Sequence, residues 1–341
     1  MKVLVTGGAG FIGSHIANHF GSKGYNVLVF DNLSREGTNK NVDWLRQNKN
    51  IMFVKGDVRN FDTLKPHMKD TELIIHTAAQ VAVTTSFKTP REDFEINAMG
   101  TFNVLEAARQ ANTNPTIVYF STNKVYGSNV NNIKLAEKKT RYEFDQKGFE
   151  FGIPEQFHTD TNNHTPYGIS KYMGELYARD YSYNFGLNTV CFRCSCMYGP
   201  RQFGNEDQGW VAHFIISSIL NRPITIYGDG KQARDVLFVD DVTKLIETAT
   251  KKIRRIKGET FNIGGGPNNT ISLLELIHII ENNLSKKTKY TFSKWRPADQ
   301  KVYVSDIRKA EKMIGWKPLI DPVTGINKLI DWVKENKSIF N

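Results

Sequence analysis

A tyrosine and a lysine one helical turn apart are the side chains best suited to catalysis. Tyr167 and Lys171 stand four residues apart in the stretch Tyr-Gly-Ile-Ser-Lys. In a helix this spacing places them on one face, where the ammonium can stabilise a phenolate and lower a pKa that is ordinarily about 10. The tyrosine would then act as a base near neutral pH. The same spacing recurs from Tyr227 and from Tyr290, where an ordinary amphipathic element is expected, so the surrounding sequence must supply the specificity.

A glycine-rich loop, Gly7-Gly8-Ala-Gly10-Phe-Ile-Gly13, follows a predicted strand and opens a predicted helix. Glycines let the backbone approach a pyrophosphate, and the helix N-terminus adds partial positive charge. Asp31, 18 residues beyond Gly13, ends the second predicted strand, where a carboxylate binds both ribose hydroxyls and repels a 2′-phosphate. These features favour NAD over NADP, although Arg35 is placed to receive such a phosphate instead.

Other residues expected near NAD also follow predicted strands. Asp57 is suited to accept a hydrogen bond from the adenine amino group, and Thr77-Ala78-Ala79 supplies small residues at the end of the fourth strand. Asn97 is either a cofactor contact or a buried helix anchor. The residues expected to bind the cofactor are Gly7, Gly10, Phe11, Ile12, Gly13, Asp31, Asn32, Ser34, Arg35, Asp57, Val58, Thr77, Ala78, Ala79, Asn97, Tyr167 and Lys171.

A Ser121-Thr122 pair lies at the end of another predicted strand, between the glycine loop and Tyr167. The Thr122 hydroxyl can bond the same substrate hydroxyl as Tyr167 and orient it while the proton leaves and hydride moves to nicotinamide. The order and context of the three elements therefore predict a hydride-transfer enzyme.

Short apolar stretches alternate with longer helical patterns through the first half of the chain. This alternation predicts an α/β fold in which parallel strands joined by helical crossovers form a doubly wound Rossmann sheet. Strands are expected at 2–6, 26–30, 51–55, 72–76, 116–121 and 188–193, and helices near 11–23, 93–111, 167–185 and 273–283.

The length of 341 residues exceeds the usual size of one domain, so a second lobe and a cleft are expected. Residues 1–184 are predicted to form the NAD-binding domain. Residues 185–341 are predicted to form mainly a smaller substrate-binding lobe, with some segments returning to the first sheet. Residues 128–164 are polar and charged with little periodicity, which indicates a long insertion near the top of the cleft.

The composition argues against several other classes of protein. The formal net charge is +10, but the basic residues are scattered or in short runs, so we expect no nucleic-acid partner and a modest preference for an anionic substrate. Short apolar runs and the lack of a secretion signal predict no membrane span and a cytoplasmic location. Cys191, Cys194 and Cys196 lack a fourth nearby ligand, so thiols are expected rather than a metal site.

Over nearly its whole length the chain resembles the extended short-chain dehydrogenases/reductases that modify nucleotide sugars. This resemblance rests on the loop, Asp31, Thr122, the Tyr/Lys pair, and the stretches Arg234-Asp-Val and Arg296-Pro-Ala-Asp-Gln. Within that superfamily the chain is most similar to the CDP-paratose 2-epimerase family, also called CDP-tyvelose 2-epimerases. The narrower resemblance is carried by residues 80–86, 121–127, 197–199, 201–203, 207–210 and 230–236.

The resemblance implies a Rossmann domain with a sugar-nucleotide lobe and a tightly held NAD that inverts C2 of a 3,6-dideoxyhexose for lipopolysaccharide O-antigen. It implies Thr122, Tyr167 and Lys171 as the catalytic set, with Arg234 and Arg296 near the diphosphate; a structural ion pair is the competing interpretation for either arginine. It also implies a homodimer or homotetramer. The substrate contacts that it implies are Gln80, Thr122, Asn123, Arg201, Gln208, Trp210, Arg234 and Arg296.

The expected reaction converts CDP-paratose to CDP-tyvelose. Because C2 has no neighbouring carbonyl, its hydrogen is not acidic, so transient oxidation at C2 and return of hydride to the opposite face is the expected route. Cys194, Cys196 and Pro200 depart from the residues that relatives tend to carry, and these departures bear on substrate preference.

Three other functions compete with this hypothesis. A UDP-hexose 4-epimerase would use the same machinery with the sugar placed differently. A dehydratase is disfavoured because such relatives carry Asp-Glu after the strand-end threonine, where this chain has Asn123-Lys124. A non-catalytic NAD-dependent sensor or binding protein is disfavoured by the intact Thr/Tyr/Lys set, although a fold alone does not fix activity.

Overall fold

The computed structural model describes residues 1–340 except 112, 161, 162 and 297. Its centre is a sheet of seven strands in the order β12-β8-β5-β4-β1-β2-β3, and every neighbouring pair is parallel. The expected doubly wound sheet is thereby confirmed. Its strands are β1 (Lys2–Thr6), β2 (Asn26–Asp31), β3 (Ile51–Lys55), β4 (Leu73–His76), β5 (Thr116–Thr122), β8 (Asn188–Cys194) and β12 (Thr260–Ile263).

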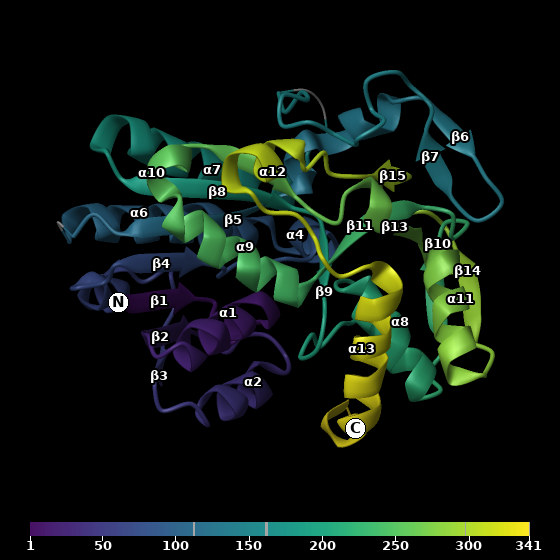
Figure 1. The fold of residues 1–341 in the computed structure, drawn as a ribbon, viewed down its shortest axis with the longest axis horizontal. Helices are drawn as coiled ribbons and strands as arrows, with labels where there is room; N and C mark the ends of the chain where they lie inside the picture. Colours follow the sequence, from purple (N-terminus) through teal and green to yellow (C-terminus); the bar gives the residue numbers. More distant parts are fainter. Residues whose placement is uncertain (112, 161–162, 297, 341) are drawn as a thin grey trace.

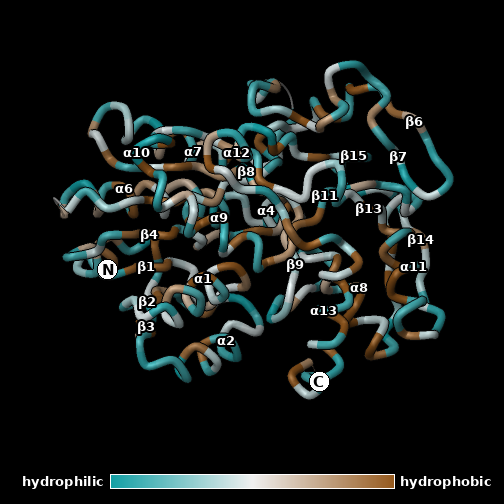
Figure 2. The backbone as a smooth tube through the Cα atoms, in the orientation of Figure 1, coloured by the Kyte–Doolittle hydropathy of each residue, from teal (hydrophilic) through white to brown (hydrophobic). Residues whose placement is uncertain are grey.

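Helices cover both faces of this sheet, because successive strand residues point to opposite sides. Val3 and Val5 of β1 pack in one core cluster with Ile16 of the first helix, whereas Leu4 packs in another with Val104. Figure 2 shows the resulting hydrophobic strands inside a largely hydrophilic outline. One face carries α1 (Phe11–Ser22), α9 (Val239–Lys251) and α12 (Arg308–Ile314); the other carries α3 (Phe61–Leu64), α6 (Gly100–Gln110) and α7 (Pro166–Phe185).

The helix expected at 93–111 is built from three consecutive pieces. They are α5 (Pro90–Phe94), a π-helical turn η2 (Glu95–Met99) and α6. A π turn inserts an extra residue into the helical repeat, so side-chain periodicity alone does not reveal it. The helices expected near 11–23, 167–185 and 273–283 are present with ends that differ by one residue.

A second group of elements lies to the right of the sheet in Figure 1. Within it, β11 pairs with β9 and β15 in parallel and with β13 in antiparallel fashion, and β10 pairs with β14. Helices α8, α11 and α13 pack around a separate core cluster. These elements are β9 (Cys196–Tyr198), α8 (Trp210–Ile219), β10 (Ile224–Tyr227), β11 (Ala233–Phe238), β13 (Thr270–Ser272), α11 (Leu273–Leu284), β14 (Tyr290–Ser293), β15 (Val302–Tyr303) and α13 (Pro322–Glu335).

The polar segment at 128–164 packs against this second group. It contains a hairpin of β6 (Leu135–Glu137) and β7 (Tyr142–Phe144). Two contacts with Lys231 hold this hairpin: the Tyr142 N–H donates to the Lys231 carbonyl at 2.9 Å, and the Lys231 ammonium pairs with Glu137 at 2.6 Å. Residues 161 and 162 of the segment lie outside the described part of the chain. The remaining elements are α2 (Thr38–Leu45), η1 (Lys65–Met68), α4 (Val83–Lys88), η3 (Asn123–Asn132), α10 (Ile253–Ile256), η4 (Pro267–Asn269) and η5 (Lys337–Phe340).

Among the described residues, no helix has both the length and the apolar character needed to cross a membrane.

Candidate functional site

The sequence-predicted polar residues gather at one edge of the central sheet. Gly7 follows β1, Asp31 ends β2, Asp57 follows β3, Thr77 follows β4 and Thr122 ends β5. Because the strands are parallel, their carboxyl ends meet at a single edge, where open α/β sheets bind ligands.

The glycine loop packs so closely that side chains are excluded. Gly7 has a φ of +68°, and a Cβ there would lie 2.4 Å from the backbone nitrogen of Ala78. A Cβ on Gly13 would lie 2.4 Å from the Gly7 carbonyl oxygen. Gly10 caps α1 without a side-chain hydrogen bond, so the first turn can offer its N–H groups to an anion. The loop therefore fits a pyrophosphate.

Asp31, at the end of β2, and Asp57, just after β3, have pKa values shifted in opposite directions. Asp31 accepts hydrogen bonds from the N–H groups of Leu33 (2.7 Å) and Ala9 (3.1 Å), yet burial raises its pKa. Burial works in the same direction at Asp57, but hydrogen bonds from Arg59 and Asn32 outweigh it and lower the pKa of Asp57 to about 2. Both groups are suited to accept hydrogen bonds from an adenosine, and the position of Asp31 fits the ribose.

The Thr/Tyr/Lys group stands at the centre of this edge. Thr165 caps α7, accepting the Gly168 N–H at 3.1 Å, and Pro166 occupies the first helical position. Tyr167 is thus in the first turn of α7, and Lys171 follows one turn later. A hydrogen bond between the side chains of Thr122 and Tyr167 acts to lower the pKa of Tyr167. The Nζ of Lys171 lies 4.4 Å from the centre of the Tyr119 ring. Lys171 as a whole is buried, with only 2% of its surface exposed.

The pKa of Tyr167 differs from the expected lowering. Burial raises the pKa of Tyr167, and the hydrogen bond with Thr122 lowers it. Burial is the larger effect, and the resulting pKa is about 12. Burial also lowers the pKa of Lys171 to about 8, so its ammonium group loses its proton more readily than that of an exposed lysine. At Tyr167, desolvation therefore outweighs the hydrogen bond with Thr122 and the charge of Arg35.

A buried ion pair supports the strand end beneath Thr122. Arg193 and Glu175 are 4% and 0% exposed, and their closest contact is 2.6 Å. Glu175 also accepts the Ser121 hydroxyl at 2.9 Å, and Arg193 donates to the Tyr126 hydroxyl at 3.0 Å. Removing one member would leave an uncompensated buried charge, so the network fixes β5 relative to α7 and β8.

Asn97 is bonded as a helix anchor. Its side chain accepts the Gln80 N–H at 2.9 Å and donates to the Gln80 carbonyl at 3.0 Å and to Ser170 at 3.1 Å. The Gln80 side chain donates to Asp93 at 2.8 Å and to the Ala82 carbonyl at 2.9 Å. These bonds tie the loop after β4 to the π turn η2 and to α7.

Arg234 is held by a carboxylate that lies 65 residues further along the chain. Its Nη2 donates to Oδ1 of Asp299 at 2.8 Å and to the Gln300 carbonyl, and its Nη1 donates to the Ala233 carbonyl at 2.8 Å. Arg234 therefore forms a structural ion pair, which was the competing interpretation to phosphate binding. Pro297, in the same stretch as Asp299, lies outside the described residues.

The other residues of the implied substrate set are dispersed. Arg296 stacks 4.0 Å above the Tyr227 ring, and Gln208 accepts from Arg35 at 3.1 Å, which connects the second lobe to the loop after β2. The Arg201 guanidinium lies 4.1 Å from the centre of the Trp44 ring in α2. Trp210 donates to the Cys196 sulfur at 3.4 Å.

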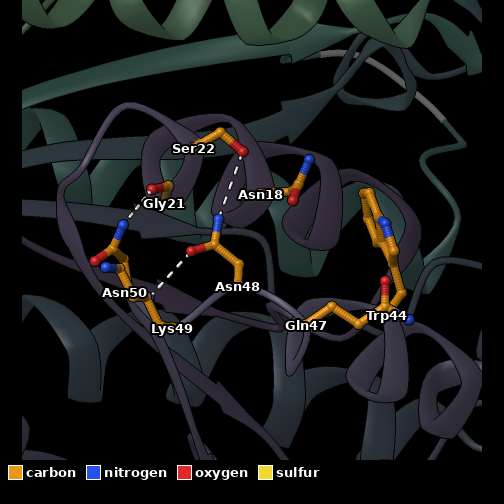
Figure 3. Close-up of a pocket in the computed structure, with 8 residues that line it drawn as sticks. All are labelled: Asn18, Gly21, Ser22, Trp44, Gln47, Asn48, Lys49 and Asn50. Carbon is orange, nitrogen blue, oxygen red and sulfur yellow. Dashed lines mark hydrogen bonds between the residues drawn. The ribbon is translucent and has the colours of Figure 1, made fainter.

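Another hollow lies at the opposite edge of the sheet (Figure 3). It is lined by residues of α1, of α2 and of the segment before β3, among them Gly21, Trp44 and Asn48. Two of its side-chain amides are bonded within the protein: Asn50 donates to the Gly21 carbonyl at 2.9 Å, and Asn48 donates to the Ser22 hydroxyl at 3.5 Å. It lies at the amino ends of the strands, away from the glycine loop. Within the described residues, no group of three or more His, Cys, Asp or Glu side chains could hold a metal ion.

Two polar residues beside the site carry no role in the sequence analysis. Asp299 is the partner of Arg234, and Lys124 directs its ammonium at Gln300 at 3.4 Å. The sequence context of Lys124, in the stretch 121–127 and in the place of the dehydratases' glutamate, assigned it no role of its own. Its position two residues after the strand-end threonine is the signal that could have identified it.

The parallel sheet, the glycine cradle and the Thr/Tyr/Lys group define a dinucleotide-dependent oxidoreductase fold. The chain belongs to the NAD dependent epimerase/dehydratase family, whose model matches residues 3–264. It is 44% identical to the CDP-paratose 2-epimerase of Salmonella typhi, covering 97% of this chain and 99% of that protein. It is 34% identical to a putative UDP-glucose 4-epimerase of Methanocaldococcus jannaschii, covering 98% and 99% of the two chains.

Solved structures extend the comparison. The UDP-glucose 4-epimerase of Thermotoga maritima, solved with UDP-glucose, superposes with a TM-score of 0.84 at 28% identity, covering 99% of this chain and 100% of that one. The UDP-glucuronic acid 4-epimerase of Bacillus cereus, solved with UDP-glucuronic acid and NAD, has a TM-score of 0.82 at 29% identity, covering 98% and 100%. The chain is therefore an enzyme of the epimerase type, and NAD is its cofactor.

Proposed function

We propose that the protein converts CDP-paratose to CDP-tyvelose by inverting C2. The observation that carries the proposal is the 44% identity, over nearly the full length of both chains, with CDP-paratose 2-epimerase of Salmonella typhi. The cradle of Gly7 and Gly13 and the carboxylate of Asp31 support a bound NAD. Bound NAD supplies a hydride acceptor, and later the donor for the return of that hydride, so the cycle consumes no cofactor.

The catalytic roles are assigned to the group at the centre of the site. Thr122 orients the C2 hydroxyl, and Tyr167 takes the hydroxyl proton as the C2–H bond transfers its electron pair with the hydrogen. Lys171, buried one turn from Tyr167, supplies positive charge that lowers the cost of the phenolate. When hydride returns to the opposite face of the 2-keto sugar, Tyr167 gives the proton back. The ketone must turn within the pocket between the two transfers.

The division of labour between the two parts of the chain follows from their chemistry. Residues 1–184 bind NAD, and residues 185–341 mainly bind the nucleotide sugar, apart from β8 and β12, which belong to the central sheet. Arg234 and Arg296 bind the diphosphate, and Gln80, Asn123, Arg201, Gln208 and Trp210 complete the sugar and nucleotide contacts. For Arg234 this requires that the phosphate joins or replaces Asp299 as its partner.

We also propose that the protein forms a cytoplasmic homodimer or homotetramer. Large apolar side chains are exposed on adjacent turns of η2, α6 and α7, among them Met99 (45%), Phe102 (37%) and Tyr177 (40%). A second copy of the same face would cover them. Light scattering of the purified protein measures the mass directly, and a monomer at micromolar concentration would contradict this assignment.

The experiment is proton NMR of CDP-paratose incubated with purified protein and no added NAD. We expect the C2 signals to convert to those of CDP-tyvelose, because NAD purifies with the protein. A parallel sample with UDP-glucose tests the alternative, which the 34% identity with a putative UDP-glucose 4-epimerase favours. Conversion of UDP-glucose alone, with NAD confirmed in the preparation, would replace C2 by C4 as the reacting carbon.

A further inference from the structure

Lys124 is fixed to both halves of the catalytic group by its backbone. Its N–H donates to Oγ1 of Thr122 at 3.2 Å. On the other side its carbonyl oxygen lies against Gly168, the residue after Tyr167, so closely that a Cβ on Gly168 would stand 2.7 Å from it. The backbone of Lys124 is therefore fixed relative to Thr122 and to the first turn of α7.

The ammonium of Lys124 lies in a partly buried cluster with an excess of positive charge. Its Nζ is 3.4 Å from Oε1 of Gln300, a long contact for a hydrogen bond. The Asp299 carboxylate acts on Lys124 through its charge, but its Oδ1 already accepts from Arg234 at 2.8 Å and from the Gln300 N–H at 2.9 Å. Burial and the charge of Arg234 lower the pKa of Lys124, while Asp299 raises it, and the result is about 8.

Such a cluster has the properties of an anion site. An ammonium carries three donors, so Lys124 can donate to further acceptors while it keeps the contact with Gln300. Arg234 and Lys124 repel each other, since the charge of Arg234 lowers the pKa of Lys124, and an anion that bound both would relieve that repulsion and form charge-assisted hydrogen bonds. The chemical group that fits is a phosphate.

The backbone contact of Lys124 with Thr122 bears on which sugar carbon reacts when a phosphate lies at Lys124. In a nucleotide sugar the diphosphate is attached at C1, which is bonded to C2, whereas C4 lies across the ring. When C2 stands at Thr122 and Tyr167, the sugar-linked phosphate must lie beside them. When C4 stands there, the ring separates the phosphate from that point. A cation two residues from Thr122 therefore favours reaction at C2.

We propose that Lys124 binds the sugar-linked phosphate next to the reacting carbon and thereby selects C2 over C4 for oxidation. This inference rests on the proposed function, because it explains how that function achieves its regiochemistry. The alternative is that Lys124 only supports the Asp299–Gln300 turn.

The test uses NAD-loaded protein and pairs of nucleotides that differ by the phosphate in question. CDP contains the phosphate that carries the sugar and CMP lacks it, and UDP and UMP form the same pair for a uridine substrate. Titration calorimetry measures all four with the wild type, Lys124→Gln and Lys124→Arg. We expect Lys124→Gln to weaken the diphosphate about tenfold and leave the monophosphate unchanged, and Lys124→Arg to restore most of the difference. Lys301→Gln, which removes an exposed charge near Gln300, is the matched control and should change neither.

Turnover of CDP-paratose provides the second readout. Lys124→Gln should keep its NAD and its melting temperature and lose at least tenfold in kcat/KM. Equal losses for CDP and CMP, or wild-type binding and turnover in Lys124→Gln, would overturn the inference. Failure of the wild type to convert CDP-paratose would instead refute the proposed function, and the nucleotide pairs would still decide whether Lys124 binds the phosphate.

Discussion

The cofactor side and the substrate side of the site are built in different ways. Around Gly7 the backbone of one loop touches the backbone of the next, with no room for a Cβ, and Asp31 is bonded to two N–H groups. Around Arg234 the contacts are between charged side chains from segments far apart in sequence. The first arrangement is fixed by contacts between backbone atoms. In the second, one carboxylate pairs with Arg234 while Lys124 has only a long contact with Gln300, so we expect the partners of these two cations to change when an anionic substrate binds.

Tyr167 stands between the two sides, and Tyr167→Phe removes its phenol oxygen while keeping the buried ring, so neither form of binding should change much. We expect Tyr167→Phe to reduce epimerisation about a thousandfold, because the phenol oxygen is the proposed base. NAD content and melting temperature should stay near those of the wild type. The rate is measured by NMR, and the cofactor by absorbance after denaturation. Tyr290→Phe, at an exposed tyrosine that also precedes a lysine by four residues, should be fully active; a fully active Tyr167→Phe would contradict the catalytic assignment.

Two glycines test whether backbone contact is what forms the cofactor side. Gly7 and Gly24 have φ values of +68° and +84°, but nothing lies within 4 Å of a Cβ on Gly24. We expect Gly24→Ala to cost only the strain of a left-handed alanine, about 1 kcal/mol. Gly7→Ala should cost that strain plus about 1–3 kcal/mol of overlap and should release NAD. Urea unfolding and cofactor content measure both effects, and equal behaviour of the two variants would show that the contact with Ala78 is unimportant.

The smallest effect is expected on the substrate side, where partners are exchangeable. Arg234→Gln should raise the KM for the nucleotide sugar about tenfold, the loss of one charge-assisted contact, and leave NAD content unchanged. Steady-state kinetics at several substrate concentrations separate KM from kcat. Arg254→Gln removes an exposed charge elsewhere and should have no effect. An unchanged KM in Arg234→Gln would mean that its pairing with Asp299 is purely structural.

The same contrast explains how much the sequence predicts. The central sheet and the glycine cradle depend on local patterns, such as an apolar strand followed by glycines and a helix, so strand positions such as 2–6 and 51–55 agree with β1 and β3. The family and the cofactor were also predictable, since the residues that specify them lie in those local motifs.

The remainder depends on contacts between distant segments. The π turn η2 lies where Asn97 bonds to Gln80 and Ser170, and neither partner is near it in sequence. The raised pKa of Tyr167 follows from burial, which a helical spacing does not report. The pairing of Arg234 with Asp299 is likewise visible only after β11 and the segment before β15 have been brought together.

The position of β12 has a consequence for how the chain is made. This strand completes the central sheet beside β8, yet it is separated from β8 by the whole segment that contains β9, α8, β10, β11 and α9. While the protein emerges from the ribosome, β8 is an unpaired edge that carries Cys191 and Phe192 until residue 263 has been synthesised. The central sheet therefore cannot be completed before β12 exists, and a chain that ends between β8 and β12 leaves β8 as an unpaired, aggregation-prone edge strand.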